Sequence, residues 1–302
     1  MAENAFMLTS KGILAETPYT GAMPPHRDPL VYLPPFLWAL NVVASRTAMR
    51  EVDPAWGSFL RFALALPFFL LALRRLPHLA PLGETLFLAL SGVAVFNLVF
   101  FTGVRLAPAS DAAVVAALYP LSTAFAYSLY FRKPLSARLL GGLLLSGGGV
   151  VLLALAHAAG GEGTNRLLGD LFLVLAALLW GAYSVGVTLA VRRREPLEAT
   201  AASMLLGSLL LLPLALPHPF PEAGPKGWAA LFYTAFGGAF LAFTLWSKVL
   251  KRHPASHVAP FMNLTPALAL LLSILLLGEA PQGADLPGLL LIALGVYVTQ
   301  RG

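Results

Sequence analysis

The tripeptide Pro108-Ala109-Ser110 returns 146 residues later as Pro254-Ala255-Ser256, and this recurrence decides the fold. The same shift relates five further pairs: Gly92 and Gly238, Pro120 and Pro266, Gly142 and Gly288, Gly149 and Gly295, and Pro67 and Pro213. Leu37-Trp38 and Leu179-Trp180 match with a shift of 142, so four residues were gained in between. The chain is therefore a duplication of two halves.

The composition is that of a chain solvated by lipid. Of its 302 residues, 58% are hydrophobic and 11% are charged, whereas a soluble domain has about 45–50% apolar and about 25% charged residues. The net charge of +6 comes from basic residues that lie between apolar runs and form no single patch, which argues against a nucleic-acid partner. With no cysteine, disulfides and thiolate metal sites are excluded.

Apolar runs of about 17–25 residues are long enough to cross a bilayer as helices. We expect ten such spans, at roughly 30–49, 55–75, 84–106, 108–131, 136–157, 168–191, 198–216, 227–247, 255–278 and 285–300. They divide the chain into four parts: a tail (1–29), a first five-helix repeat (30–157), a linker (158–167) and a second five-helix repeat (168–300). The sequence leaves open whether residues 1–22, which precede Met23, belong to the native protein.

Charge predicts the orientation of these spans, because cytoplasmic loops accumulate Lys and Arg. With the N-terminus inside, 14 basic residues fall on the inner side and 5 on the outer side, and Arg61 lies within span two. Both termini of this multi-pass protein of the cell membrane are then cytoplasmic. Because each half has an odd number of spans, the second half is inverted relative to the first. The expected fold is an all-α membrane protein of ten transmembrane helices in two inverted five-helix repeats.

Several motifs resemble those of a known family. A Leu-Trp lies in the first helix of each half, Pro-Ala-Ser opens spans four and nine, and Leu277-Gly278-Glu279-Ala280 precedes the glycine-rich last span. Together, over about residues 30–300, these features resemble the EamA family of the drug/metabolite transporter superfamily. The first half departs from the pattern, because Phe131-Arg132-Lys133-Pro134 stands where the Gly-Glu signature would be. The resemblance implies secondary transport of small metabolites such as amino acids, often export.

Transporters with internal repeats bind substrate near the bilayer midplane, at the interface of the repeats and beside interrupted helices. Pro120 and Pro266 lie midway along spans four and nine. A proline inside a helix cannot bond the carbonyl four residues earlier, which frees the carbonyls of Ala116 and Met262. Polar neighbours complete this predicted lining of a central cavity: Tyr119, Asn263 and Thr265. The alternative is that both prolines are packing kinks whose backbone groups neighbouring helices satisfy.

Three aromatic residues lie well inside the membrane: Trp38, Trp180 and Tyr183. They either wall a binding site for an apolar or aromatic substrate or serve packing alone. The remaining tryptophans fit the membrane–water interfaces, where Trp ordinarily collects: Trp56, Trp228 and Trp246.

Three polar residues also lie at membrane depth. Asn41 in span one and Asn97 in span three either bind substrate or form hydrogen bonds between helices. Arg61 lies about 10 Å from the outer end of span two at 1.5 Å per residue. Its guanidinium either clamps a carboxylate or phosphate of the substrate or extends outward to the headgroups.

The acidic residues constrain the mechanism. All 14 Asp and Glu lie in tails, loops or helix ends, whereas ion-driven carriers commonly place a carboxylate near the midplane. Facilitated diffusion or exchange is therefore favoured over carboxylate-coupled proton antiport. We expect no cofactor or metal and disfavour an intramembrane enzyme, because the sequence has no His-Glu-x-x-His motif and no acidic cluster. A channel-like facilitator is the other alternative. The expected partners are a small-molecule metabolite and the lipid bilayer, while substrate identity, flux direction and oligomeric state stay open.

Overall fold

The computed structural model describes residues 23–106, 117–156, 165–278 and 282–300. In these ranges the chain is helical and contains no β-strand. The first half comprises the 3-10 turns η1 (Pro25–Arg27) and η2 (Pro29–Tyr32), then α2 (Leu33–Ala48), α3 (Pro54–Ala63), α4 (Leu66–Leu73), α5 (Leu82–Ala89), the π-helix η3 (Leu90–Ala94), α6 (Val95–Leu106), α8 (Leu118–Phe131) and α9 (Ala137–Ala156). The second half comprises α10 (Arg166–Ala190), α11 (Pro196–Ala215), α12 (Pro225–Tyr233), the π-helix η4 (Thr234–Ala242), α13 (Phe243–Arg252), α14 (Ala255–Val258), the 3-10 helix η5 (Ala259–Asn263), α15 (Leu264–Leu277) and α16 (Asp285–Thr299).

Seven helices within the described ranges are long and apolar enough to cross a membrane. They are Pro54–Leu73, Leu82–Phe100, Ala137–Ala156, Leu167–Ala190, Pro196–Ala215, Pro225–Arg252 and Ala255–Leu276. Two shorter apolar helices, Pro29–Ser45 and Asp285–Thr299, coincide with predicted spans one and ten. Helix α8 coincides with span four, whose opening residues, Pro108-Ala109-Ser110 among them, lie outside the described ranges. The total of ten spans stays a prediction.

Proline and basic residues set several helix ends. Proline is the first residue of α3, α11 and α12, where its missing N–H costs no intrahelical bond. Asp53 caps α3 by accepting a hydrogen bond from the N–H of Ala55 at 2.8 Å. Arg74 and Arg132 end α4 and α8 in the left-handed conformation, with φ of 55° and 52°. Each of these spans therefore stops at a basic residue on the same side of the bundle.

Four of the described spans contain an irregular turn, and proline or glycine residues lie at or beside it. Span two breaks between α3 and α4, just before Pro67, which cannot donate to the carbonyl of Ala63. Spans three and eight each contain a π-helix, η3 and η4, and these include the repeat-related Gly92 and Gly238. Span nine changes from α14 to the 3-10 helix η5 and then to α15. Such irregular turns are frequent at functional sites.

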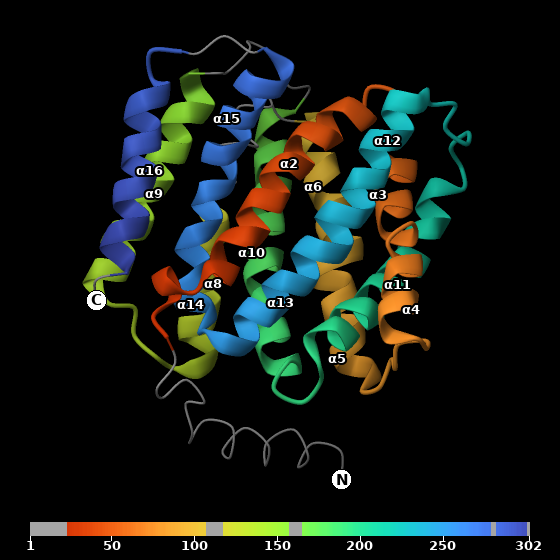
Figure 1. The fold of residues 1–302 in the computed structure, drawn as a ribbon, viewed down its shortest axis with the longest axis horizontal. Helices are drawn as coiled ribbons and strands as arrows, with labels where there is room; N and C mark the ends of the chain where they lie inside the picture. The colour runs from red at the N-terminus through yellow and green to blue at the C-terminus, as the bar shows by residue number, and fades with distance from the viewer. Residues whose placement is uncertain (1–22, 107–116, 157–164, 279–281, 301–302) are drawn as a thin grey trace.

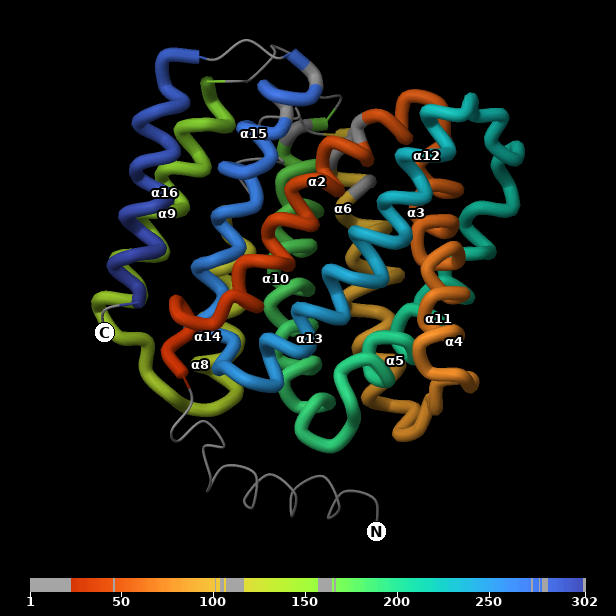
Figure 2. Tube along the Cα trace, in the orientation of Figure 1, coloured from red at the N-terminus to blue at the C-terminus, as the bar shows by residue number. Residues whose placement is uncertain are grey.

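The helices form one bundle whose successive spans run in alternate directions (Figure 1). Helices α9 and α16 pack side by side along one edge (Figures 1 and 2). Helix α2 packs against α15 and η4, and α10 packs against α8 and α6. The start of η1 and the end of α16 lie at the same end of the bundle (Figure 1).

Candidate functional site

The two tryptophans related by the duplication meet in the main hydrophobic core. Trp38 on α2 and Trp180 on α10 are both buried, and their ring centroids lie 5.4 Å apart, edge to face. Phe243, the first residue of α13, packs against both indoles at centroid distances of 5.5 and 5.9 Å. Four further rings extend this group, which we call the aromatic centre: Phe96, Tyr119, Tyr183 and Trp246.

These further rings reach the aromatic centre from several elements. Phe96 and Tyr183 lie 5.7 and 5.5 Å from Trp180, and Tyr119 stacks on the same indole at 6.3 Å. Trp246 contacts Trp38 at 6.0 Å. Three predicted site residues, Tyr119, Trp180 and Tyr183, thus come together with the predicted Trp38. Sequence reasoning missed Phe96 and Phe243, because nothing distinguishes them from the other phenylalanines of an apolar chain.

The expectation that Trp246 lies at a membrane–water interface is wrong. Its side chain is fully buried and belongs to the same core as Trp38. Lys248 and Lys251 lie on the exposed face of α13. The opposite face, with Trp246 and Val249, turns inward, so the amphipathic pattern of α13 was the usable signal.

Several polar atoms of the core lack a protein partner. Among the described residues, the indole N–H groups of Trp180 and Trp246 and the hydroxyl of Thr244 find no hydrogen-bond partner, although all three are buried. The large majority of buried side-chain polar atoms in proteins are bonded to protein or ordered water. Leaving such a group unsatisfied costs about 1–3 kcal/mol. A bound water or a polar ligand at the aromatic centre would remove this cost.

Asn41 and Tyr183 occupy equivalent places in the two halves, since 142 separates them. A Cβ atom at Gly238 would overlap the amide of Asn41, and one at Gly92 would overlap the ring of Tyr183. Both glycines lie in the π-helices, so each π-helix is in close contact with a predicted site residue. The Oδ1 atom of Asn41 is buried without a partner.

The other two asparagines are bonded within the protein. Asn97 donates to the carbonyl of Val93, one turn earlier in the same span, at 2.5 Å. Asn263 donates to the hydroxyl of Ser146 on α9 at 2.8 Å. Both amides are buried. The Asn263 contact is an interhelical hydrogen bond, the alternative that the sequence left open for Asn41 and Asn97.

The proline hypothesis holds only in part. Pro266 is the third residue of α15, and the break precedes it in η5, which Pro260 opens. The expected free carbonyl of Met262 is wrong, because it accepts from the N–H of Leu264 in the tightened turn. Thr265 keeps a buried hydroxyl without a partner. Pro120 is buried in the first turn of α8, and Ala116 lies outside the described ranges.

Arg61 lies beside the aromatic centre. Its guanidinium carbon is 5.0 Å from the ring centroid of Phe62. Phe62 is buried and lies 6.4 Å from Phe243 of the aromatic centre. The Nε atom of Arg61 is buried and has no hydrogen-bond partner. Stacking on a core phenyl ring keeps the cation inside the bundle, in contrast to an arginine extended toward the headgroups.

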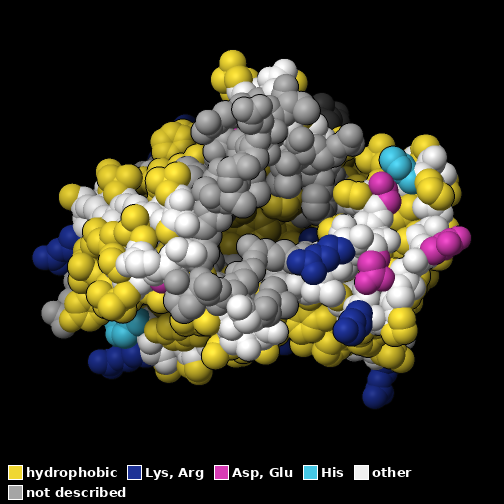
Figure 3. Space-filling model, turned by 90° about the horizontal axis from the view of Figure 1, so that it is seen from above, with side chains coloured by type: hydrophobic (Ala, Val, Ile, Leu, Met, Phe, Trp, Pro, Cys, Tyr) yellow, Lys and Arg dark blue, Asp and Glu magenta, His cyan; other side chains and the backbone are white. Residues whose placement is uncertain are grey.

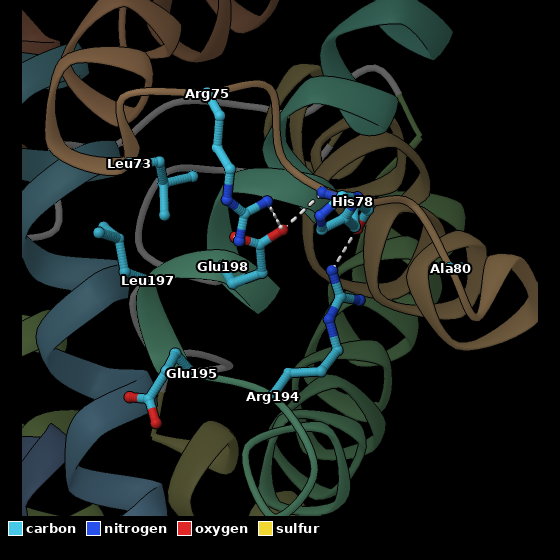
Figure 4. Close-up of a pocket in the computed structure, with 8 residues that line it drawn as sticks. All are labelled: Leu73, Arg75, His78, Ala80, Arg194, Glu195, Leu197 and Glu198. Atoms are coloured by element: carbon cyan, nitrogen blue, oxygen red, sulfur yellow. Dashed lines mark hydrogen bonds and ion pairs between the residues drawn. The ribbon is translucent and has the colours of Figure 1, made fainter.

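Ion pairs gather at one end of the bundle. Figure 4 shows the guanidinium of Arg75 facing the carboxylate of Glu198, with bonds of 2.8 and 3.2 Å. The N–H of His78 also donates to Glu198, and Arg194 bonds the carbonyl of His78 and, at 3.0 Å, the hydroxyl of Thr85. Arg75, His78, Arg194 and Glu198 line a cavity of about 480 Å³ that opens beside the loop after α4. None of them was among the predicted site residues, because loop charges carried no signal beyond orientation.

A second cluster at this end holds the start of span one. Asp28 bonds Arg252 at 3.2 Å and His253 at 3.0 Å, and its carboxylate caps the N–H of Leu30. Burial alone raises the pKa of Asp28, but the hydrogen bonds from His253, Leu30 and Arg252 outweigh it and hold that pKa below its usual range. Lys251 pairs with Glu195 at 2.8 Å nearby. Asp28 therefore belongs to the packed structure, although it was assigned to the tail.

The opposite end, where α2 ends and α12 begins, is built differently. Figure 3 shows hydrophobic side chains set back near the middle of this face. Toward one side, the carboxylate of Glu51 accepts from the N–H of Gly224 at 2.6 Å, and Asp53 lies 3.6 Å from His218. Within the described ranges, no group of three or more His, Asp or Glu could hold a metal ion.

Membrane-length apolar helices packed around a buried aromatic centre are those of a multi-pass membrane protein. The model of the EamA-like transporter family matches residues 28–155 and 167–301. The chain therefore belongs to the EamA-like transporter family, which confirms the resemblance in the sequence motifs.

Curated relatives cover nearly the whole chain. One from Archaeoglobus fulgidus, named an uncharacterized transporter, is 26% identical over 89% of this chain and 96% of its own. A probable amino-acid metabolite efflux pump of Salmonella typhimurium is 25% identical over 88% and 92%. A probable terminal-alkyne amino-acid exporter of Streptantibioticus cattleyicolor is 25% identical over 76% and 74%. A solved crystal structure, 24% identical, matches 89% of this chain and 94% of its own with a TM-score of 0.77, which shows a common fold.

Proposed function

We propose that the chain is a secondary transporter that exports or exchanges small metabolites such as amino acids across the cell membrane. Substrate binds at the aromatic centre, at the midplane between inverted five-helix repeats (30–157 and 168–300) joined by the linker 158–167. The observation that carries this proposal is the contact between Trp38 and Trp180 at 5.4 Å, because equivalent residues of two repeats meet only near their common axis. The amino-acid names of the Salmonella and Streptantibioticus relatives support the substrate class.

Close contacts of glycines support the inversion of the two halves. A Cβ atom at Gly142 would lie 2.7 Å from the carbonyl oxygen of Gly295, and one at Gly149 would lie 2.7 Å from that of Gly288. Gly142 of α9 thus pairs with Gly295 of α16, and Gly149 pairs with Gly288. When each residue is replaced by its counterpart in the other half, 146 positions away, one of these contacts becomes the other. This is the relation expected when a twofold axis passes between two antiparallel helices. The pairing of Asn41 with Gly238 and of Tyr183 with Gly92 obeys the same exchange.

The two ends of the bundle support an alternating-access mechanism. Ion pairs around Asp28 and Glu198 link spans at one end, beside the cavity of about 480 Å³, and hydrophobic side chains are set back from the surface at the other end (Figure 3). A carrier caught in one of its two states has one side closed and the other open. The excess of basic residues supports a cytoplasmic position for the end with the ion pairs and for both termini, with the opposite end facing outward.

The remaining predicted residues take different roles in this proposal. Arg61 and Asn41 face substrate, and Asn263 links α9 to span nine through its bond to Ser146. Asn97 bonds a carbonyl of its own span. The shape of spans four and nine beside the proposed substrate site is set by Pro120, Thr265 and Pro266. A channel-like facilitator stays the second candidate, and no enzymatic step is part of the proposal.

The test is substrate exchange in vesicles. Cells that overproduce the chain are first screened for tolerance to a panel of amino acids and analogues. The hit is then measured in proteoliposomes, where a carrier saturates and is accelerated by substrate on the opposite side. We expect Trp180→Ala to abolish both effects, and Trp228→Ala, a tryptophan outside the aromatic centre, to retain them. Saturable flux unchanged in Trp180→Ala would refute the site, and flux without acceleration by opposite-side substrate would favour a channel.

A further inference from the structure

Arg61 is the one basic residue that lies away from the ends of the described membrane spans. The other Lys and Arg of these spans fall in their first or last turns, such as Arg138, Lys226 and Lys251. The carboxylates of the spans lie near their starts: Glu84, Asp170, Glu198 and Asp285. The described interior of the bundle therefore carries one positive charge and no negative charge at comparable depth.

The surroundings of Arg61 provide no counter-charge. The side chain forms no hydrogen bond or ion pair within the described ranges, and its Nε is buried. Phe62 lies under the guanidinium, and Phe243 links that ring to the two indoles. Arg61 is only partly buried, and of its guanidinium nitrogens Nε is the one that is fully buried without a partner.

The duplication supplies no partner either. Position 61 corresponds to Gly207 in the second half, where a Cβ atom would overlap Val93, so no charged side chain fits there. An unpaired charge in a membrane interior is costly, and intramembrane ionisable residues ordinarily pair or face a polar pathway. A guanidinium offers two parallel donors, which match the two oxygens of a carboxylate.

We infer that Arg61 binds a carboxylate of the substrate, so that the transporter selects organic anions with an apolar body over neutral and cationic analogues. The apolar body packs against the aromatic centre, whose free indole N–H groups of Trp180 and Trp246 satisfy further acceptors. The inference rests on the proposed transport function and narrows its substrate class. An amino acid would be held by its carboxylate, since the described interior offers no anion for an ammonium group.

One consequence concerns the transport cycle. Without substrate, the charge of Arg61 is unpaired while the site is closed to both sides during reorientation. With a carboxylate bound, the pair is neutral. Loaded carrier should therefore reorient faster than empty carrier, which makes anion exchange the dominant mode.

The experiment uses three probes with the same ring and different charge: phenylacetate, phenylacetamide and phenethylammonium. Binding to purified full-length protein in detergent is measured by thermal stabilisation, and exchange is measured by counterflow in proteoliposomes. We expect phenylacetate to stabilise and exchange, and the other two to do neither. Arg61→Gln should weaken phenylacetate binding at least roughly tenfold, since a hydrogen bond to a charged group is lost. The unliganded Arg61→Gln protein should melt no lower than the parent, which shows that it folds.

Arg192→Gln is the matched control. Arg192 also lies over a phenyl ring, that of Phe131 at 5.1 Å, and its Nε is likewise buried without a partner. It follows the end of α10, outside the membrane span, so its loss should leave phenylacetate binding unchanged. The inference is overturned if phenethylammonium or phenylacetamide binds as tightly as phenylacetate, if phenylacetate does not bind, or if Arg61→Gln binds it normally. Binding that depends on Arg61 without any flux would uphold the inference and refute the transport function. Flux of other solutes that depends neither on Arg61 nor on solute charge would uphold the transport function and refute the inference.

Discussion

A single methyl group added at Gly149 should loosen the contact between α9 and α16. The Cβ of an alanine there would lie 2.7 Å from the carbonyl oxygen of Gly288 and 2.8 Å from the amide nitrogen of Ile292. These are backbone atoms, which cannot rotate away as a side chain can, so the helices must separate. Overpacking of this kind costs about 1–3 kcal/mol.

Gly148 gives a control one residue away. It is exposed on the same helix, and a Cβ atom there meets nothing within 4 Å. Gly148→Ala should therefore be neutral or stabilising by up to about 1 kcal/mol, the difference in helix propensity between glycine and alanine. The same gain offsets part of the cost in Gly149→Ala, so the comparison between the two variants isolates the steric term.

The assay is the apparent melting temperature of both variants in one detergent at one heating rate, because large proteins often unfold irreversibly. We expect Gly149→Ala to melt several degrees below Gly148→Ala, at roughly 2–4 °C per kcal/mol. Gly141→Ala and Gly142→Ala repeat the comparison, since only Gly142 faces the backbone of α16. Equal melting temperatures within both pairs would refute the close approach of the two helices, and with it the main support for the twofold axis.

Two further predictions concern hydrogen bonds and charge. Because the folded-state pKa of Asp28 lies below 3.8, its contribution to stability is present at neutral pH and is lost as pH falls through that lowered pKa. The difference in melting temperature between the parent and Asp28→Asn should thus shrink below about pH 4, and a difference that persisted there would show that charge is not its source. Asn263→Ala and Ser146→Ala should show a coupling of about 0.6 kcal/mol or more in a double-mutant cycle of unfolding free energies, with strictly additive losses as the contrary result.

The duplication made part of the site predictable from the sequence. Trp38 and Trp180 attracted attention because both are tryptophans at equivalent depth, and two such positions meet when the axis passes between them. The class of protein followed from composition, since 58% hydrophobic and 11% charged residues exclude a soluble fold. Neither inference required knowledge of which face each helix turns inward.

The irregular turns could not be predicted in the same way. In a nearly continuous apolar run, hydrophobic periodicity disappears, so the π-helices at Leu90–Ala94 and Thr234–Ala242 leave no trace in a hydropathy pattern. Their signal was the repeated Gly92 and Gly238, which shows where two elements approach closely but not how the backbone accommodates it. Trp246 was misassigned for a different reason, because the amphipathic pattern of α13, which places it on the buried face, was not used.

Symmetry and chemistry are divided between different residues of the chain. The glycine contacts, the two tryptophans and the paired π-helices recur in both halves, as needed for two conformations of similar energy that exchange the roles of the halves. A substrate is not symmetric, so the groups that recognise it must break the repeat. Arg61 departs from the repeat, because its counterpart in the second half is the uncharged Gly207. If the repeats set the motion and the exceptions set the specificity, substitution at Gly92 or Gly238 should slow the exchange of every substrate alike, whereas substitution at Arg61 should change which substrate is exchanged.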